Sequence, residues 1–188
     1  ANCNNNQLIN ITVSGNRPLG FYNYSINLQN KEFSELILCN ADYSNLNNIT
    51  IKGSDSKKNN GLLVVRTDYS NLTNINSSYT NIGIELISSS NNNLLNNSGS
   101  EIFLSSSSNN TLIRNIVNLD YSGISIHYGS NNILNNNYIN SNGWGISLVS
   151  SSNNIITNNN INPTINILWI YSSSNNKIYQ LDRDGKLI

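Results

Sequence analysis

His127 is the only histidine of the chain, and Asp120 lies shortly before it. A histidine near a carboxylate can serve in acid–base catalysis, and hydrolysis of a glycosidic bond needs two carboxyl groups about 5–10 Å apart. The chain repeats about every 22 residues, and the positions one repeat before and after Asp120 hold Ser98 and Asn142. No second carboxylate therefore comes into register with Asp120, and we expect His127 to be an ordinary surface residue.

Glu85 and Glu101 are closer to each other in sequence than any other pair of acids in the repeats. Glu85 takes an outward position, Glu101 takes a position that other repeats fill with glycine, and no histidine or arginine stands beside either of them. We therefore expect no catalytic residues and no enzyme. Two cysteines and one distant histidine cannot supply the four ligands of a closed metal site, so we also expect no metal and no cofactor.

Cys3 and Cys39 are the only cysteines. A disulfide between them would close a loop of about 36 residues and contribute about 3–4 kcal/mol. The alternative is two unrelated buried thiols. In a secreted protein the N-x-S/T sequons would be candidate glycosylation sites; they begin at Asn10, Asn23, Asn48, Asn71, Asn76, Asn96 and Asn109.

The elements that position these residues follow from a five-fold repeat that starts at Gly83 and ends each unit with an Asn pair. The second Asn of each pair is Asn92, Asn110, Asn132, Asn154 and Asn176, so the steps are 18, 22, 22 and 22. Two aliphatic positions, one residue apart, precede every pair: Ile84 and Leu86, Ile102 and Leu104, Ile124 and Ile126, Ile146 and Leu148, Leu168 and Ile170. This period-two pattern predicts a strand with one buried face, and a fixed period in this range predicts stacked units.

The Asn columns predict the corners between strands. Asn tolerates the left-handed backbone better than other residues that carry a side chain, and its amide can bond to the Asn one coil away. A second column, at Asn97, Asn115, Asn137 and Asn159, predicts a second corner of the same kind. We interpret both columns as architectural.

The sequence thus predicts an all-β, single-domain, right-handed parallel β-helix of about 7–8 coils with roughly 22 residues per coil. Residues 1–36 are expected to form an N-terminal strand and capping segment, 37–180 the β-helix, and 181–188 a C-terminal cap or assembly segment. The motif D-Y-S-N-L at Asp42 and again at Asp68 indicates longer coils in the first half, with an exposed loop from Gly53 to Gly61.

Composition excludes several partners. Asn accounts for 44 of 188 residues and the formal net charge is zero, so no basic field attracts nucleic acid or anionic membranes. No apolar run is long enough to span a bilayer, and we expect no membrane insertion. The chain starts at Ala1 and contains no Met, as expected of a mature product whose signal peptide has been removed or of a chain trimmed at its start.

The pattern G-I-x-L-x-x-S-S-N-N-x-I-x-x-N resembles the parallel β-helix repeats of the NosD-like, carbohydrate-binding-and-sugar-hydrolysis group. The resemblance covers Gly83 to Tyr179 well and Ile37 to Asn81 loosely. It implies a fold common in secreted and surface proteins and shared with pectin hydrolases, lyases and uronate epimerases. Asn118-Leu119-Asp120 and His127-Tyr128-Gly129 resemble motifs of the pectin hydrolases, with Arg183 and Lys186 further on, but the paired Asp is missing. The copper binding that the NosD name implies is at odds with the absence of Met and of a His cluster.

Two functions remain open from sequence. The first is an extracellular or cell-surface structural protein that assembles into a homo-oligomer or polymer, for example by strand addition at the alternating segment Gln7 to Val13 or at the charged turn Asp182 to Lys186. The alternative is a polysaccharide-binding or polysaccharide-degrading module. Aromatic side chains at outward or corner positions are its candidate sugar or subunit contacts: Phe103, Tyr128, Trp144, Trp169 and Tyr171.

Overall fold

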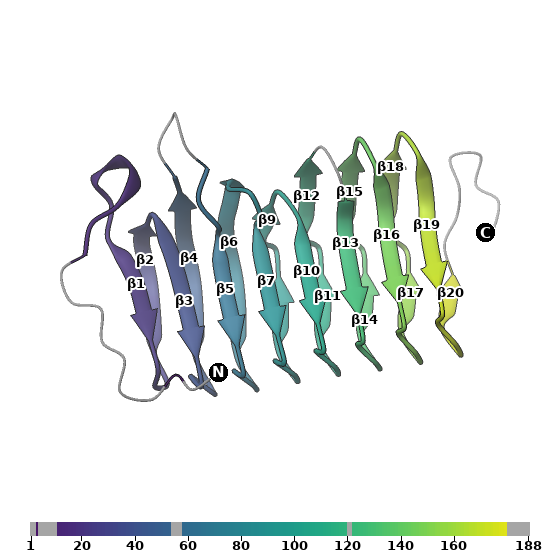
Figure 1. The fold of residues 1–188 in the computed structure, drawn as a ribbon, viewed down its shortest axis with the longest axis horizontal. Helices are drawn as coiled ribbons and strands as arrows, with labels where there is room; N and C mark the ends of the chain where they lie inside the picture. Colours follow the sequence, from purple (N-terminus) through teal and green to yellow (C-terminus); the bar gives the residue numbers. More distant parts are fainter. Residues whose placement is uncertain (1–2, 4–10, 54–57, 120–121, 180–188) are drawn as a thin grey trace.

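The computed structural model describes residues 3, 11–53, 58–119 and 122–179, which form two parallel β-sheets wound as a solenoid. Figure 1 shows the coils side by side along the long axis of the molecule. The eight-stranded sheet takes one strand from each coil: β1 (Leu19–Tyr22), β3 (Glu35–Cys39), β5 (Leu62–Val65), β7 (Ile84–Ile87), β10 (Ile102–Ser105), β13 (Ser122–His127), β16 (Trp144–Val149) and β19 (Asn166–Tyr171). The predicted all-β parallel β-helix of 7–8 coils is therefore confirmed.

The twelve-stranded sheet forms the rest of each coil, and from β8 onward it contributes two short strands per coil. Its strands are β2 (Asn27–Phe33), β4 (Asn45–Lys52), β6 (Asn71–Tyr79), β8 (Asn93–Leu95), β9 (Ser98–Gly99), β11 (Thr111–Ile113), β12 (Ile116–Leu119), β14 (Ile133–Asn135), β15 (Tyr138–Ser141), β17 (Ile155–Thr157), β18 (Asn160–Pro163) and β20 (Lys177–Tyr179). The only helical element among the described residues is the 3-10 turn η1 (Ser14–Asn16).

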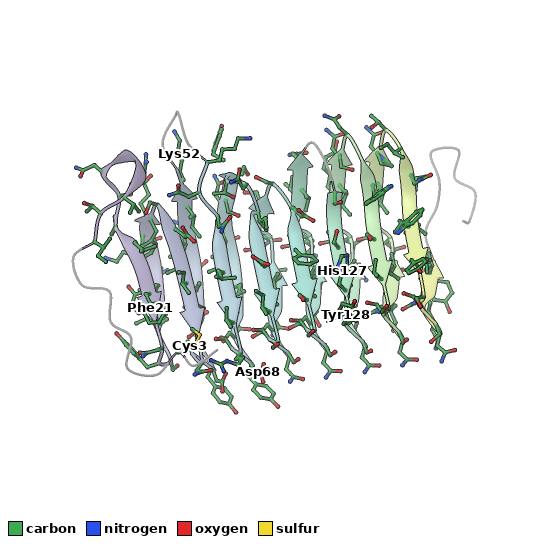
Figure 2. All side chains as sticks on the ribbon, in the orientation of Figure 1. Cys3, Phe21, Lys52, Asp68, His127 and Tyr128 are labelled. Atoms are coloured by element: carbon green, nitrogen blue, oxygen red, sulfur yellow. A yellow bond between two sulfur atoms is a disulfide. The ribbon has the colours of Figure 1, made fainter. Side chains whose placement is uncertain are left out.

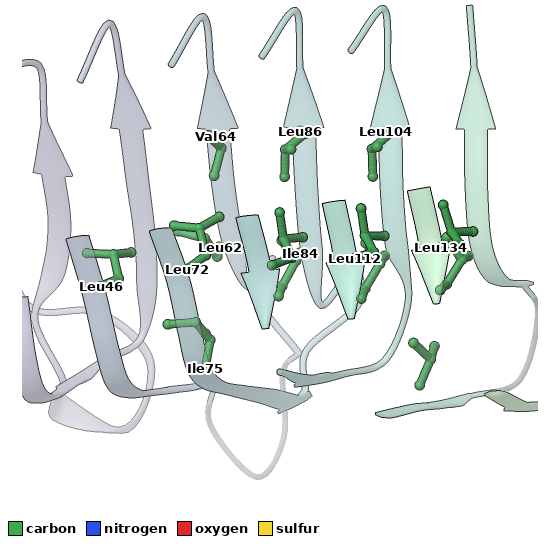
Figure 3. Packing of buried hydrophobic residues seen from close by; sticks show 14 of the residues in the cluster. Leu46, Leu62, Val64, Leu72, Ile75, Ile84, Leu86, Leu104, Leu112 and Leu134 are labelled. Atoms are coloured by element: carbon green, nitrogen blue, oxygen red, sulfur yellow. The ribbon is translucent and has the colours of Figure 1, made fainter. Parts of the chain in front are cut away.

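The core is a set of aliphatic ladders, since every coil repeats the same buried positions. Ile102 pairs with Ile84 on one side and with Ile124 on the other, and all three side chains are fully buried. Figure 3 shows Leu112 and Leu134 in the same way, on neighbouring coils of the twelve-stranded sheet. Burial of each such side chain stabilises the fold by about 1.5–3 kcal/mol, and a coil can bury its apolar face only against its neighbours.

Each regular coil contains three residues with positive φ, which turn the chain between strands. The first two lie three residues apart, at the corner that follows each strand of the eight-stranded sheet from β3 onward: Asn40, Arg66, Ser88, Ser106, Tyr128, Ser150 and Ser172, then Tyr43, Tyr69, Asn91, Asn109, Asn131, Asn153 and Asn175. The third set is Asn30, Asn48, Asn74, Asn96, Arg114, Asn136 and Asn158. The prediction of left-handed corners is therefore right, although Ser, Tyr and Arg also take these positions.

The two members of each Asn pair have different tasks. The first turns the backbone, as Asn131 does with φ of 59°, while the second is buried and bonds to neighbouring coils. Asn132 accepts from the Asn110 amide N–H at 2.9 Å, and its own side-chain amide donates to the Ser107 carbonyl and to Asn154 Oδ1. Asn137 makes the equivalent bonds at the second corner. These bonds supply partners for backbone groups that the strands leave unpaired at the corners.

The D-Y-S-N-L motifs are the first-half counterparts of S-S-N-N. Asp42 Oδ1 accepts the backbone N–H of Asp68 at 2.7 Å, and Asp68 Oδ1 accepts that of Ser90 at 2.6 Å. The two tyrosines of the motifs, Tyr43 and Tyr69, stack at the same corner with ring centroids 5.3 Å apart. These coils therefore belong to the same solenoid, as the sequence indicated.

After the first coil, coil length varies at one corner only. In six coils the residue numbers of two buried positions differ by thirteen. The first position lies in the strand of the eight-stranded sheet and the second is the last buried residue at the second corner: Leu36 to Ile49, Leu62 to Ile75, Ile84 to Asn97, Ile102 to Asn115, Ile124 to Asn137 and Ile146 to Asn159. The return to the next strand of the eight-stranded sheet, which we call the variable corner, differs in length from coil to coil. Its longest instance joins β4 to β5 and coincides with the loop predicted from Gly53 to Gly61, of which residues 54–57 lie outside the described residues.

The chain enters the solenoid earlier than expected. β1 already pairs with β3 in parallel, and β2 pairs with β4, so a boundary at residue 37 falls too late. The pattern is hard to see there because the first coil is shorter than its neighbours and its strands expose polar residues. Cys3 and Cys39 form the predicted disulfide, with Cα atoms 5.8 Å apart. The predictions for Asn10, Gln7 to Asn10, Asp120 and residues 181–188 lie outside the described residues.

Candidate functional site

A short variable corner between β9 and β10 creates a hollow on the outside of the eight-stranded sheet. Only four residues lie between Asn97 and Ile102, against eight between Asn115 and Ile124. In Figure 1 the connection from β9 to β10 accordingly lies lower than those from β15 to β16 and from β18 to β19. A hollow of about 270 Å³ opens there, lined by Glu101, Phe103, Ser125, His127, Trp144 and Ser147 among others.

The short corner is held firmly on the coil before it. Ser100 Oγ donates to the carbonyls of Thr80 and Ser78 at 2.6 and 3.3 Å. Gly83 gives the corner room, because a Cβ at Gly83 would lie 2.7 Å from Gly99 Cα and equally close to the Ser100 backbone nitrogen. The position of Glu101, the next residue, therefore follows from backbone contacts rather than from a mobile loop.

The parallel register of β10, β13, β16 and β19 extends this hollow into a longer trough across the outside of the eight-stranded sheet. Phe103, Ser125, Ser147 and Trp169 occupy the same outward position on four successive coils. The two serines, each only 4% exposed, form a floor of small side chains between two aromatic side chains, which lie three coil steps or about 14 Å apart. We call the strip from Phe103 to Trp169 the trough.

Aromatic rings form both ends of the trough. Trp144 stacks on Trp169 with centroids 5.5 Å apart and planes 16° from parallel. Phe103 meets the His127 ring edge to face at 4.9 Å. Figure 2 shows His127 on the front sheet and Tyr128 at the corner below it. Rings of this kind offer apolar faces to a ligand that also carries hydrogen-bonding groups.

Two carboxyl groups stand at the Phe103 end. Glu85 is the register partner of Phe103 on β7, and Glu101 lines the hollow just before β10. Burial raises the pKa of Glu101 above its ordinary value, and the negative charge of Glu85 raises it further. The Ser125 hydroxyl, which donates to Glu101 Oε1 at 3.3 Å, lowers this pKa and so opposes the other two effects. Burial also raises the pKa of Glu85 and lowers that of His127. The site is thus acidic and partly desolvated, with a histidine that favours its neutral form.

The structure brings together three of the five aromatic residues that the sequence singled out, Phe103, Trp144 and Trp169. Tyr171 lies beside them, in the outward column that runs from His127 through Val149. Tyr128 is 66% exposed but sits at the corner, outside the hollow. Two of the five candidates, Trp144 and Trp169, therefore stack on each other, and Phe103 lies at the opposite end of the trough.

The sequence-based expectation for the acids and the histidine needs correction. Glu101 was expected to have no histidine beside it, yet Glu101 and His127 line the same hollow. They come from adjacent coils in the regular 22-residue register, but the register partner of His127 is Ser105, four residues after Glu101. A search for residues at equivalent positions of neighbouring repeats therefore could not detect the pair.

The described sequons are distributed over the exterior. Asn48, Asn71, Asn76, Asn96 and Asn109 are exposed, while Asn23 is half-buried and donates to the Cys3 carbonyl. Asn71 also borders a second, groove-like hollow on the twelve-stranded sheet, with Thr73, Asn93 and Leu95.

The chain belongs to the NosD family: the family model described as "Periplasmic copper-binding protein (NosD)" matches residues 10–180. The predicted family is thus confirmed. The family description also supports an extracytoplasmic location, the coarser part of the expectation from sequence. No curated protein is similar enough in sequence to count as a match.

Among solved structures, the chain is similar to a point mutant of the periplasmic alginate epimerase AlgG, with 17% identity and a TM-score of 0.51. The similarity covers 76% of this chain but 35% of the epimerase, so the chain spans about a third of that protein's length. Weaker similarities are to QnrB1, a fluoroquinolone resistance protein, with 10% identity, a TM-score of 0.35 and coverage of 88% of this chain and 92% of that one. The pentapeptide repeat protein HetL from Nostoc gives 11% identity, a TM-score of 0.24 and coverage of 92% of both chains. At 17% identity, the similarity to the epimerase shows the fold alone.

The residues of this chain do not fit the copper of the family description. Soft Cu(I) sites use Cys and Met, and Cu(II) sites use imidazole. The chain has one His and no Met, and both of its cysteines are joined in the disulfide. Within the described ranges no three His, Cys, Asp or Glu side chains lie close enough to share a metal ion. Nor does any helix in the described part of the chain have the length and apolar character needed to cross a bilayer.

Proposed function

We propose that the protein is an extracytoplasmic polysaccharide-binding β-helix, located outside the cell or at its surface, that holds a glycan in the trough. One observation carries the proposal. Trp144 and Trp169 stack at one end, and Phe103 stands at the other, above a floor of serines. Sugar rings present apolar faces that pack on aromatic side chains and hydroxyls that bond to a carboxylate such as that of Glu101.

We further propose that this site binds its glycan without cleaving it. A glycosidase places its two carboxyl groups on opposite sides of the bond that breaks. Both described carboxyls of the trough, Glu85 and Glu101, stand at the Phe103 end, whereas Ser125 and Ser147 take the outward positions on the next two coils. Apart from His127, the rest of the trough offers aromatic rings over two buried serines, which do not transfer protons.

Intrinsic fluorescence gives a direct test, since Trp144 and Trp169 are the only tryptophans of the chain. A panel of neutral, acidic and basic oligosaccharides should include a ligand that saturates a change in this emission. Trp144→Ala or Trp169→Ala should weaken that ligand about tenfold, the effect of one aromatic contact. Tyr138→Ala is the matched control, because Tyr138 is 42% exposed on the other sheet. A panel with no ligand, or equal effects of the three variants, contradicts the proposal.

A second candidate function, self-assembly into a structural polymer, is favoured by the exposed edge of β19. Ile170 continues the column of fully buried Leu148 but is itself 45% exposed. An open strand edge with apolar side chains readily pairs with another strand, and we propose a second copy of this chain as the partner. The polymer would belong to the cell exterior, where the exposed sequons could carry glycans.

Sedimentation velocity tests this second candidate. Ile170→Lys should abolish oligomers, whereas Ile133→Lys, at a 37% exposed position in the middle of the twelve-stranded sheet, should retain them. Removal of residues 1–14 should also abolish assembly if the N-terminal segment is the second contact. A wild-type protein that sediments as a monomer at every concentration rules the mechanism out.

A further inference from the structure

We infer that the trough selects glycans carrying free, protonated amino groups, that is, de-N-acetylated amino sugars, over neutral N-acetylated sugars and over uronates. This inference rests on the proposed function, because it assigns a substrate class to the same site. It is carried by the two carboxylates beside the aromatic rings and by the lack of any lysine or arginine lining the hollow among the described residues.

Neither Glu85 nor Glu101 forms an ion pair with a cationic side chain among the described residues. Glu101 lines the hollow, and its only described hydrogen bond comes from the neutral Ser125 hydroxyl. The single ion pair among the described residues is Arg17 with Glu32, near the other end of the solenoid. Glu85 and Glu101 sit on adjacent coils and repel each other, so a cation placed between them would relieve an unfavourable interaction on both sides.

An ammonium group is the cation that suits these surroundings. It can donate a charge-assisted hydrogen bond to Glu101 while the sugar ring packs on Trp144 or Phe103, and a cation close to those rings gains further attraction. N-acetylation removes the charge and keeps the ring contacts. A uronate would bring a third carboxylate to the same place, and like charges in contact suppress binding.

The test compares three oligosaccharides of equal length by calorimetry and by tryptophan emission, near neutral pH and at low ionic strength: a glucosamine oligomer, its N-acetylated form and an oligogalacturonate. The glucosamine oligomer should bind at least about tenfold more tightly than its N-acetylated form, the effect of one charge-assisted hydrogen bond. Glu101→Gln should remove that difference and leave the N-acetylated form unaffected. Trp144→Ala should weaken both.

Glu35→Gln is the matched control, because Glu35 is also partly buried, with a pKa raised by burial, but lies on β3 away from the trough. Preferential binding of the oligogalacturonate, or a glucosamine preference that persists in Glu101→Gln, overturns the inference. Equal binding of the amine and its N-acetylated form, still dependent on Trp144, overturns the inference and leaves the proposed function standing. Absence of binding by every glycan removes both.

Discussion

Substitution of Asn132 by alanine tests the account of the Asn ladder. The Asn132 side chain is fully buried in the middle of the solenoid. Its Oδ1 accepts from the backbone N–H and the side-chain amide of Asn110, and its own amide donates to Ser107 and Asn154. Alanine removes all of these bonds and leaves the core columns untouched.

The magnitude follows from which groups lose their partners. Asn110 Nδ2 retains the Ser89 carbonyl, and Asn154 Oδ1 retains the backbone N–H of residue 132. The Asn110 backbone N–H and the Ser107 carbonyl lose the partners described above and stay buried. Each orphaned group costs about 1–3 kcal/mol, so we expect a loss of about 2–6 kcal/mol, a large share of the 5–15 kcal/mol typical of a domain.

Urea unfolding, followed by far-UV circular dichroism and by tryptophan emission, measures the loss. Two probes are needed because stacked coils can unfold in stages. Asn118→Ala is the control, since Asn118 is exposed on β12. If Asn132→Ala costs no more than this control, within about 0.5 kcal/mol, the ladder does not contribute to stability in the way we describe.

Three further predictions concern the short corner and the disulfide. Burial raises the pKa of Glu101 in the folded protein, so its negative charge lowers stability only at pH values above the carboxyl pKa of the unfolded chain. Glu101→Gln should therefore leave the urea midpoint unchanged below that pKa and raise it near neutral pH. A difference between the variant and the wild type that stays constant across pH contradicts this. Gly83→Ala should cost about 1–3 kcal/mol by overpacking against Gly99, and an unchanged midpoint would show that the corner can move aside. Replacing Cys3 and Cys39 together by serine should cost about 3–4 kcal/mol, measured against the reduced wild type, which should lose a similar amount.

The architecture could be predicted because the same residue types return to the same positions. The columns that include Ile84 and Leu94 identify the buried faces, and they pair in the predicted register. The separate tasks of Asn131 and Asn132 could not be predicted, since adjacent identical residues give no sign of which one turns the backbone and which one is buried. Only the backbone dihedral and the stacking direction distinguish them.

The site was less predictable than the fold. The aromatic candidates were found because Phe103 and Trp169 share a column, but the stacking of Trp144 on Trp169 depends on how far one corner projects over the next strand. Glu101 and His127 line one hollow although they are not at equivalent positions of their coils, because the register partner of His127 is Ser105. The step of 18 shows a shortfall without locating it, and only the paired register assigns it to the segment after Asn97.

The constancy of thirteen positions in six coils restricts where this molecule can change. A one-residue insertion within those positions would break the ladders and reverse the facing of the side chains that follow in the same strand, whereas one at the variable corner leaves both sheets in register. In these six coils, tolerance for added or deleted sequence is thus confined to a single seam parallel to the axis. Because that seam borders the trough, new recognition chemistry can be grafted there without rebuilding the scaffold, much as hypervariable loops diversify on a fixed framework.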